Sequence, residues 1–120
     1  MERRELGAWG EERAAKYLRG KGYTIVERNF RCRSGEIDII ARRGDIIAVV
    51  EVKLRRDADF AEAREFVTAA KQRRVIMTAG YWLTSHQTEL QPRFDVIEIY
   101  APSGERTLFP KINHLEDAFQ

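Results

Sequence analysis

The sequence predicts an α/β fold in which one mixed β-sheet is flanked by helices. The first observation behind this is the order of the predicted elements, which runs helix, three strands, helix, strand. The second is the segment Ile46–Leu54, which is apolar on both faces over most of its length and is typical of a central, buried strand. With 120 residues, the chain is expected to form a single domain, residues 1–120, whose core needs no disulfide or metal.

The first half of the chain is expected to hold one helix and three strands. Apolar and small residues recur with helical spacing from Gly7 to about Arg19, and Gly20 and Gly22 end this helix. The strands are expected at Tyr23–Phe30, Glu36 to about Arg42, and Ile46 to about Leu54. The Gly44-Asp45 pair between the last two strands is a hairpin signal.

The second half is expected to hold a second helix and at least one more strand. A polar loop from Arg55 to Asp59 should lead into a helix from Ala61 to about Leu83, in one piece or two. Pro92 should precede a fourth strand, Phe94–Tyr100. The remaining expectations are a turn at Pro102–Gly104 and a short fifth strand at Arg106–Phe109, with the last ten residues left unassigned.

Composition describes an ordinary globular protein, with 43% hydrophobic and 33% charged residues and a net charge of +2. The single cysteine, Cys32, excludes an intrachain disulfide and fits a reducing cytoplasm. The segment Met1–Leu6 has no apolar stretch, and no run approaches the roughly 20 apolar residues that span a bilayer. We therefore expect a cytoplasmic protein with no membrane partner.

Basic residues gather in two parts of the chain, although the net charge is small. Such clusters can bind phosphates, or they can simply form a solvated surface. They are Arg28, Arg31, Arg33, Arg42, Arg43, Lys53, Arg55 and Arg56 in the first part, and Lys71, Arg73 and Arg74 in the second. Walker and dinucleotide-binding glycine motifs are missing, and His86 and His114 have no partner at metal-ligand spacing.

Charged residues interrupt two strands that should be apolar. Glu51 and Lys53 fall on the same face of the third strand as Ile47 and Val49. Asp38 likewise stands between isoleucines in the second strand. Leaving such groups unpaired in the interior would cost several kcal/mol, so they need a partner or a function.

Hairpin register decides whether these acids meet. A two-residue turn at Arg43-Gly44 would place Asp38 opposite Val49, and one at Gly44-Asp45 would place it opposite Glu51. Both alternatives put Asp38 on the face of Glu51 and Lys53. A three-residue loop without a bulge would put it on the other face, so the predicted site depends on an even loop.

Both helices carry polar residues on faces that should be buried. Glu11 lies in the middle of a stripe with Gly7, Ala14 and Leu18, so it should point toward the sheet, whereas Glu12 should be solvated. In the second helix the inward stripe continues toward its start through polar residues. These are Thr68, Lys71 and Gln72.

This set of residues suits metal-dependent hydrolysis of a phosphodiester. Mg²⁺ takes one or two carboxylates and leaves positions for water and phosphate oxygens. Asp38 and Glu51 would be the ligands, with the main-chain carbonyl of Val52 as a third and Glu11 as an accessory ligand or a base. Lys53 would orient the water and offset charge on the phosphate. Alternatively, the acids and Lys53 form a partly buried ion-pair network without catalysis.

At these positions the sequence resembles the PD-(D/E)xK nuclease superfamily, with its restriction-endonuclease-like αβββαβ core, and more narrowly the bacterial YraN family. The resemblance runs nearly end to end. Its pieces are Gly7-x-x-Gly10-Glu11-x-x-Ala14, Tyr17-Leu18, Gly22-Tyr23, Asn29-Phe30-Arg31, Gly35-Glu36-Ile37-Asp38-Ile39-Ile40, Val50-Glu51-Val52-Lys53-x-Arg55, Lys71, Arg93-Phe94-Asp95-Val96-Ile97, His114-Leu115 and Ala118-Phe119.

The resemblance implies that Asp38, Glu51 and Lys53 match the catalytic Asp, Glu and Lys, and that Glu11 matches the first-helix acid of the Holliday-junction-resolvase branch. Ile37 replaces the proline of the motif. The implied activity is an endonuclease that uses Mg²⁺ or Mn²⁺ on DNA, including branched or damaged DNA. The residues expected to contact the nucleic acid are Arg55, Arg56, Lys71, Gln72 and Arg73.

Three hypotheses remain open at this point. The chain is a metal-dependent endonuclease, a noncatalytic nucleic-acid-binding module, or a structural protein whose acids form ion pairs. Cleavage of both strands of a duplex or junction would suit a C2 homodimer.

Overall fold

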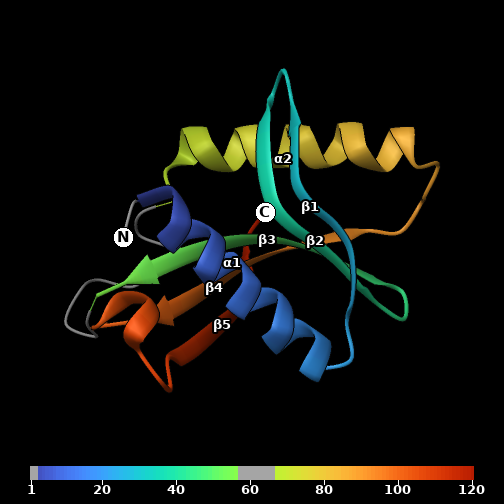
Figure 1. The fold of residues 1–120 in the computed structure, drawn as a ribbon. Helices are drawn as coiled ribbons and strands as arrows, with labels where there is room; N and C mark the ends of the chain where they lie inside the picture. Colours follow the sequence, from blue (N-terminus) through green and yellow to red (C-terminus); the bar gives the residue numbers. More distant parts are fainter. Residues whose placement is uncertain (1–2, 57–66) are drawn as a thin grey trace.

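The computed structural model describes residues 3–56 and 67–120 (Figure 1). They form a five-stranded sheet in the order β1-β2-β3-β4-β5, in which β3 and β4 are parallel and the other neighbours are antiparallel. The elements are α1 (Arg3–Gly20), β1 (Thr24–Cys32), β2 (Gly35–Arg43), β3 (Ile46–Arg55), α2 (Ala69–Ser85), β4 (Pro92–Tyr100), the 3-10 helix η2 (Gly104–Arg106) and β5 (Lys111–Phe119).

The predicted fold class is confirmed, because α1, β1, β2, β3, α2 and β4 follow one another in the expected αβββαβ order. The helix predicted from Ala61 is described only from Ala69, since residues 57–66 lie outside the described part of the chain. For the same reason, only the start of the predicted loop after Arg55 can be compared. Neither described helix is long and apolar enough to span a membrane.

The fifth strand was predicted in the wrong place. Residues 101–107 instead form a tight turn, in which the Gly104 N–H donates to the Ala101 carbonyl at 3.0 Å and Gly104 adopts φ +59°. The turn leaves Leu108 and Phe109 exposed by 78% and 92%. The actual strand, β5, falls in the segment that the sequence left unassigned. As an edge strand with one neighbour, it mixes polar and apolar residues too freely to give a clear pattern.

Two apolar layers hold the helices to opposite faces of the sheet (Figure 1). Alternate residues of β3 divide between the two layers, as strand geometry requires. Ile47 and Val49 pack in the layer that includes Val75, Ala79 and Trp82 of α2. On the other face, Ala48 and Val50 pack with Ala14, Ala15 and Leu18 of α1. Strand β3 is therefore buried on both sides, as its sequence predicted.

One carboxylate inside the sheet is fully compensated. Asp95, which is 0% exposed, accepts two hydrogen bonds from the Arg93 guanidinium at 2.9 and 2.8 Å and one from the Asp117 N–H at 3.0 Å. His114 Nε2 lies 2.8 Å from the same carboxylate. Arg93 also donates to the Tyr23 hydroxyl at 2.6 Å. The network thus ties β4 and β5 to the segment that precedes β1.

These contacts make Asp95 a stabilising acid. Burial on its own would raise the pKa of Asp95, but hydrogen bonds from His114, Arg93 and the Asp117 main chain outweigh it and hold the pKa below its ordinary value. A carboxyl whose pKa is lower in the folded state stabilises the fold above its unfolded pKa of about 3.9, and this contribution is lost as pH falls.

We predict that Asp95→Asn lowers the free energy of unfolding by about 3–5 kcal/mol at pH 7, because it removes the buried negative charge that pairs with Arg93. Urea unfolding followed by circular dichroism measures the change, and the difference from wild type should shrink as the pH is lowered toward 3. Glu116→Gln is the control, since Glu116 is exposed and 3.9 Å from Arg93. Equal losses in both variants would contradict the prediction.

Candidate active site

The candidate site lies where β2 and β3 stop pairing. Their register runs from Arg43↔Ile46 to Ile39↔Val50 and goes no further. Beyond that point β2 pairs only with β1, and β3 only with β4. The next residues on the two strands are Asp38 and Glu51. The two acids therefore stand on either side of a gap that opens between neighbouring strands.

The hairpin that sets this register has the even loop on which the prediction depended. The two-residue turn consists of Gly44 and Asp45, between the paired residues Arg43 and Ile46. Gly44 adopts φ +60°, a conformation that glycine reaches without strain. Of the two registers considered from the sequence, the structure thus has the one that sets Asp38 toward Glu51.

Asp38 is held in the gap by the main chain of β3. Its Oδ2 accepts a hydrogen bond from the Val52 N–H at 2.8 Å. The carboxylate thereby replaces the partner that β2 would have supplied had the ladder continued. Because the N–H and C=O of a strand residue point to the same side, the Val52 carbonyl faces the gap as well. The carboxylates of Asp38 and Glu51 and the carbonyl of Val52 therefore border the gap.

Glu51 is 7% exposed and is contacted by two ammonium groups. The Nζ of Lys71 lies 2.8 Å from its Oε1, and the Nζ of Lys53 lies 3.5 Å from the same oxygen. Lys53 comes from the same strand, and Lys71 comes from the first turn of α2. The prediction that Lys53 lies beside the acids therefore agrees with the geometry, while Lys71 is closer still.

The start of α2 is built to deliver Lys71. Thr68 caps the helix, and its Oγ1 accepts a hydrogen bond from the Lys71 N–H at 3.1 Å. Gln72 donates its side-chain amide to the Val67 carbonyl at 2.9 Å, which fixes the entry of the chain into the helix. Burial on its own would lower the pKa of Lys71, but its hydrogen bond to Glu51 and the charges of Glu51, Asp38 and Glu36 raise it.

Glu11 approaches from the other face of the sheet. A Cβ atom on the preceding residue, Gly10, would lie 3.0 Å from the Leu54 side chain, so α1 packs closely on the end of β3 at this point. Glu11 is partly buried, whereas Glu12 is exposed and binds Arg28 at 2.7 Å. Glu11 is thus the less exposed of the two glutamates, as its place in the stripe predicts. The charge of Glu11 also contributes to the raised pKa of Asp38.

The described part of the chain does not form a three-acid metal cage. Within residues 3–56 and 67–120, no three Asp, Glu, His or Cys side chains come together closely enough to hold a metal ion. What the structure brings together is a smaller donor set, consisting of Asp38, Glu51 and the side of the strand that carries the Val52 carbonyl. Two carboxylates and a carbonyl fit Mg²⁺ or Mn²⁺, which take few protein ligands and retain water. Glu11 is placed as a neighbour of this set.

The residues predicted to contact nucleic acid divide into two groups. Arg56 and Arg73 are exposed. The other three are engaged within the protein, since Lys71 binds Glu51 and Gln72 binds Val67. The Arg55 side chain is only 14% exposed, and its Nε lies 3.9 Å from the buried carboxylate of Glu98. The two exposed arginines are therefore the ones the structure leaves directed at solvent.

Sequence reasoning overlooked several polar residues of the second half. His114, dismissed as isolated, lies 2.8 Å from Asp95 and 3.2 Å from the Tyr17 hydroxyl. Glu98 is 0% exposed and accepts a hydrogen bond from Asn113 at 2.7 Å. Both acids interrupt the apolar strand β4, the same signal that singled out Asp38, so the pattern was available. Their partners in β5 could not be identified from the sequence, because that strand had no clear pattern.

Comparison with known proteins supplies the family. A model of the group described as "Uncharacterised protein family UPF0102" matches residues 10–99. A UPF0102 protein of Caldicellulosiruptor saccharolyticus is 42% identical over 120 residues, which is 99% of this chain and 100% of that one. The chain belongs to this family. This confirms the YraN-like family predicted from the sequence.

A second UPF0102 relative also matches over nearly its whole length. The protein of Rhodococcus jostii is 45% identical over 115 residues, covering 95% of each chain. Among solved structures, Pyrococcus furiosus SfsA in complex with Ca²⁺ has 11% identity and a TM-score of 0.34, covering 94% of this chain and 63% of that one. A likeness at this TM-score carries no functional inference. The UPF0102 match includes Glu11, Asp38, Glu51, Lys53 and Lys71.

Asp38, one of the two acids at the gap, has a strongly raised pKa. Burial raises its pKa to about 7, and the charges of Glu51 and Glu11 act in the same direction. The hydrogen bond from Val52 and the charge of Lys71 oppose this rise without cancelling it. A carboxyl whose pKa is raised in the folded state loses its stabilising contribution as pH rises from its unfolded value of about 4 through 7. The ionised Asp38 therefore destabilises the fold.

We predict that Asp38→Asn raises the free energy of unfolding by a few kcal/mol at pH 8, since each pKa unit corresponds to about 1.4 kcal/mol. The amide oxygen of asparagine can still accept the hydrogen bond from Val52. Thermal unfolding from pH 4 to pH 8 measures the effect, which should be small at pH 4 and reach a plateau above pH 7. A variant less stable than wild type at pH 8 would contradict the assigned electrostatics.

Proposed function

We propose that this protein is a metal-dependent endonuclease that hydrolyses phosphodiester bonds in DNA. The observation that carries the proposal is the pair of acids at the gap between β2 and β3, bordered by two lysines. Asp38 and Glu51 face this gap from different strands, and Lys53 and Lys71 both contact Glu51. Opposed carboxylates beside ammonium groups suit the binding of a cation and a phosphate together.

The two acids and the Val52 carbonyl would hold Mg²⁺ or Mn²⁺. When bound, such an ion polarises the phosphoryl group and stabilises the leaving oxygen. The pKa of Asp38 is raised chiefly by burial, and the charges of Glu51 and Glu11 add to the rise against the charge of Lys71. A bound cation would offset this buried negative charge. Asp38 keeps its orientation through the Val52 N–H, so it is held ready to bind rather than free to rotate.

The lysines have separate roles in this proposal. Lys53 lies 3.5 Å from Glu51, too far for a strong hydrogen bond, and its ammonium is available to a water or to a phosphoryl oxygen. Lys71 makes the shorter 2.8 Å contact and pairs the buried Glu51 carboxylate with a cation. Glu11 raises the local negative charge from the other face and is placed to orient a water. Together they bind the substrate phosphate and prepare the attacking water.

The noncatalytic alternative also has an observation in its favour. Glu51 is already occupied by Lys71 at 2.8 Å, and the described residues contain no three-acid metal cage. A module that binds nucleic acid through its arginines would tolerate this arrangement without moving Lys71. It would bind in a salt-dependent way and would not cleave.

We predict that wild-type protein cleaves at least one of linear, flapped and four-way DNA when Mg²⁺ or Mn²⁺ is added. Asp38→Asn, Glu51→Gln and Lys53→Ala should each reduce cleavage by at least about 100-fold, because each removes a group that stabilises charge in the transition state. Initial rates on labelled DNA with and without chelator measure the effect. Since Asp38→Asn is expected to be more stable than wild type, its loss of activity cannot be assigned to unfolding.

The adjacent glutamates of α1 provide a matched control. Glu11→Gln should reduce cleavage, whereas Glu12→Gln should leave it unchanged, because Glu12 is exposed and pairs with Arg28 and Arg19. Cleavage that persists in Asp38→Asn, or that needs no metal, would overturn the proposed site. Salt-sensitive binding without cleavage of any substrate would favour the noncatalytic module.

A further inference from the structure

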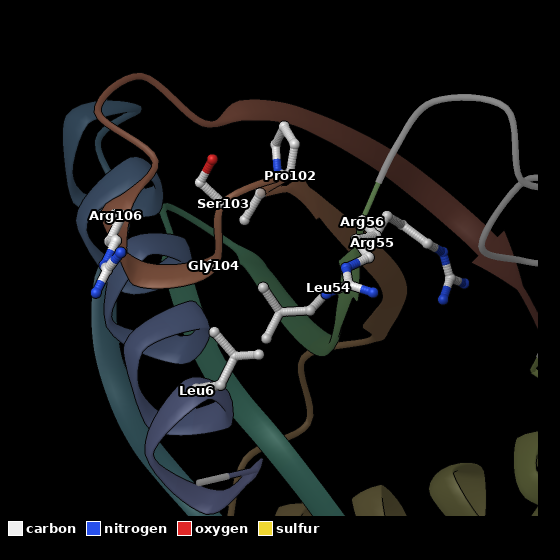
Figure 2. Close-up of a pocket in the computed structure, with 9 residues that line it drawn as sticks. Leu6, Leu54, Arg55, Arg56, Pro102, Ser103, Gly104 and Arg106 are labelled. Carbon is white, nitrogen blue, oxygen red and sulfur yellow. The ribbon is translucent and has the colours of Figure 1, made fainter. Parts of the chain in front are cut away.

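A hollow of about 670 Å³ lies near the end of β3 (Figure 2). The chemistry proposed for the candidate active site gives this hollow no role. It is bordered by the start of α1, the end of β3 and the turn at residues 101–106. Leu6 and Leu54 form its apolar floor, and Pro102 lies on the opposite side. Arg56 and Arg106 extend on opposite sides of it in Figure 2. The hollow thus combines an apolar floor with cationic rims.

The turn that forms one rim is fixed by its own hydrogen bonds. The Gly104 N–H donates to the Ala101 carbonyl at 3.0 Å, and the Arg106 N–H donates to the Ser103 carbonyl at 3.1 Å. The Thr107 hydroxyl accepts from the Ser103 N–H at 3.0 Å. A rim fixed in this way loses little conformational entropy when a ligand binds.

The charge around the hollow comes from its exposed arginines. Arg55 also lines it, but its guanidinium lies 3.9 Å from Glu98, which offsets its charge. Glu105 lies between the rim residues in sequence, yet it lines an adjoining hollow of about 280 Å³. Arg56 and Arg106 are therefore the exposed cations that line this hollow.

The hollow lies farther along β3 than the candidate active site, on the face of the strand that α1 covers. Leu54 directly follows Lys53, and Arg56 lies three residues beyond it, which is about 10 Å along an extended chain. On α1, Gly10 packs on the same Leu54, and Glu11 is the next residue. A polyanion that placed one phosphate at Asp38 and Glu51 would reach this hollow by passing around the end of β3.

We propose that the hollow is a second subsite for nucleic acid, which receives one unpaired nucleotide next to the bond that is cut. Its base packs on Leu6, Leu54 and Pro102, and the flanking phosphates bind Arg56 and Arg106. The assignment rests on the proposed nuclease function and adds a preference for flapped or branched DNA over blunt duplex.

Size and chemistry favour an unpaired nucleotide over a base pair. The volume falls within the range of about 300–1,000 Å³ that is typical of sites for small ligands, so it suits a single nucleotide better than a duplex. Enzymes that accept an unstacked base hold it against apolar or aromatic side chains, while basic groups follow the backbone. An apolar floor between two arginines provides both kinds of contact.

The test measures binding without cleavage, in an Asp38→Asn background with chelator, by fluorescence anisotropy of labelled flapped and blunt DNA. Arg106→Ala should weaken flap binding about fivefold to tenfold and reduce the slope of log K against log salt by about 1. Blunt duplex should be affected less. Arg42→Ala is the matched control, because this exposed arginine lies at the β2–β3 turn, at the opposite end of β3.

A second measurement tests whether the base packs on the apolar floor of the hollow. Removing one base from the flap should weaken binding about fivefold at a single position near the junction, and Leu6→Asn should abolish that dependence. Equal behaviour of Arg106→Ala and Arg42→Ala, or tolerance of abasic sites at every position, would overturn the subsite. Because binding is measured without turnover, the subsite can fail while cleavage stands. Cleavage can likewise be absent while the Arg106 effect supports the subsite.

Discussion

The β2–β3 ladder ends at Ile39↔Val50, and the arrangement of the site depends on this interruption. Main-chain groups that lose a ladder partner must find another, and Asp38 supplies one for the Val52 N–H. The same gap exposes Glu51 to Lys71 from α2 and lets the charge of Glu11 act on Asp38 from α1. Had the ladder continued, the helices would lie on opposite sides of a closed sheet. The gap therefore joins residues from both layers into one site.

Acids within the strands of this sheet have two different fates. Asp95 is enclosed by Arg93, His114 and the Asp117 N–H, and its pKa is held below the ordinary value. Asp38 has one main-chain donor and two acidic neighbours, and its pKa rises to about 7. Both residues interrupt apolar strands, so the interruption alone does not identify a functional acid. The neighbours decide whether the charge is neutralised or left available.

Much of the fold was predictable because local patterns agree with the final packing. The apolar strand Ile46–Leu54 is central, the Gly44-Asp45 turn sets the register, and the spacing on α1 separates Glu11 from Glu12. Strand period, turn chemistry and helix period are properties of short segments. For that reason Asp38, Glu51 and Lys53 could be placed on one face before any coordinates were known.

The remaining features depend on contacts between distant segments. Strand β5 is defined by its pairing with β4 and not by a clear pattern of its own, so His114 could not be matched with Asp95. Arg55 and Gln72 turn inward because Glu98 and the Val67 carbonyl lie within reach, which no local spacing predicts. The sequence predicts a strand at Arg106, whereas the hydrogen bonds of the 101–107 turn place this residue at the rim of the hollow. The direction of side chains at turns and edge strands is thus the feature that the sequence predicts least well.

Strand β3 contributes to the core, to the candidate site and to the hollow. It begins as core with Ile47 and Val49, becomes polar at Glu51 and Lys53, and ends beside the cationic hollow. The burial of Asp38 against this strand is unfavourable, because its ionised form lacks sufficient compensation. The neighbouring strand β4 carries the opposite case, since Asp95 is stabilised by its partners and is fully buried. A small domain can keep one acid in an unfavourable environment when the neighbouring strands are held together by well-paired groups such as Asp95. An unfavourable interaction that is confined to one gap in the sheet is typical of a functional site.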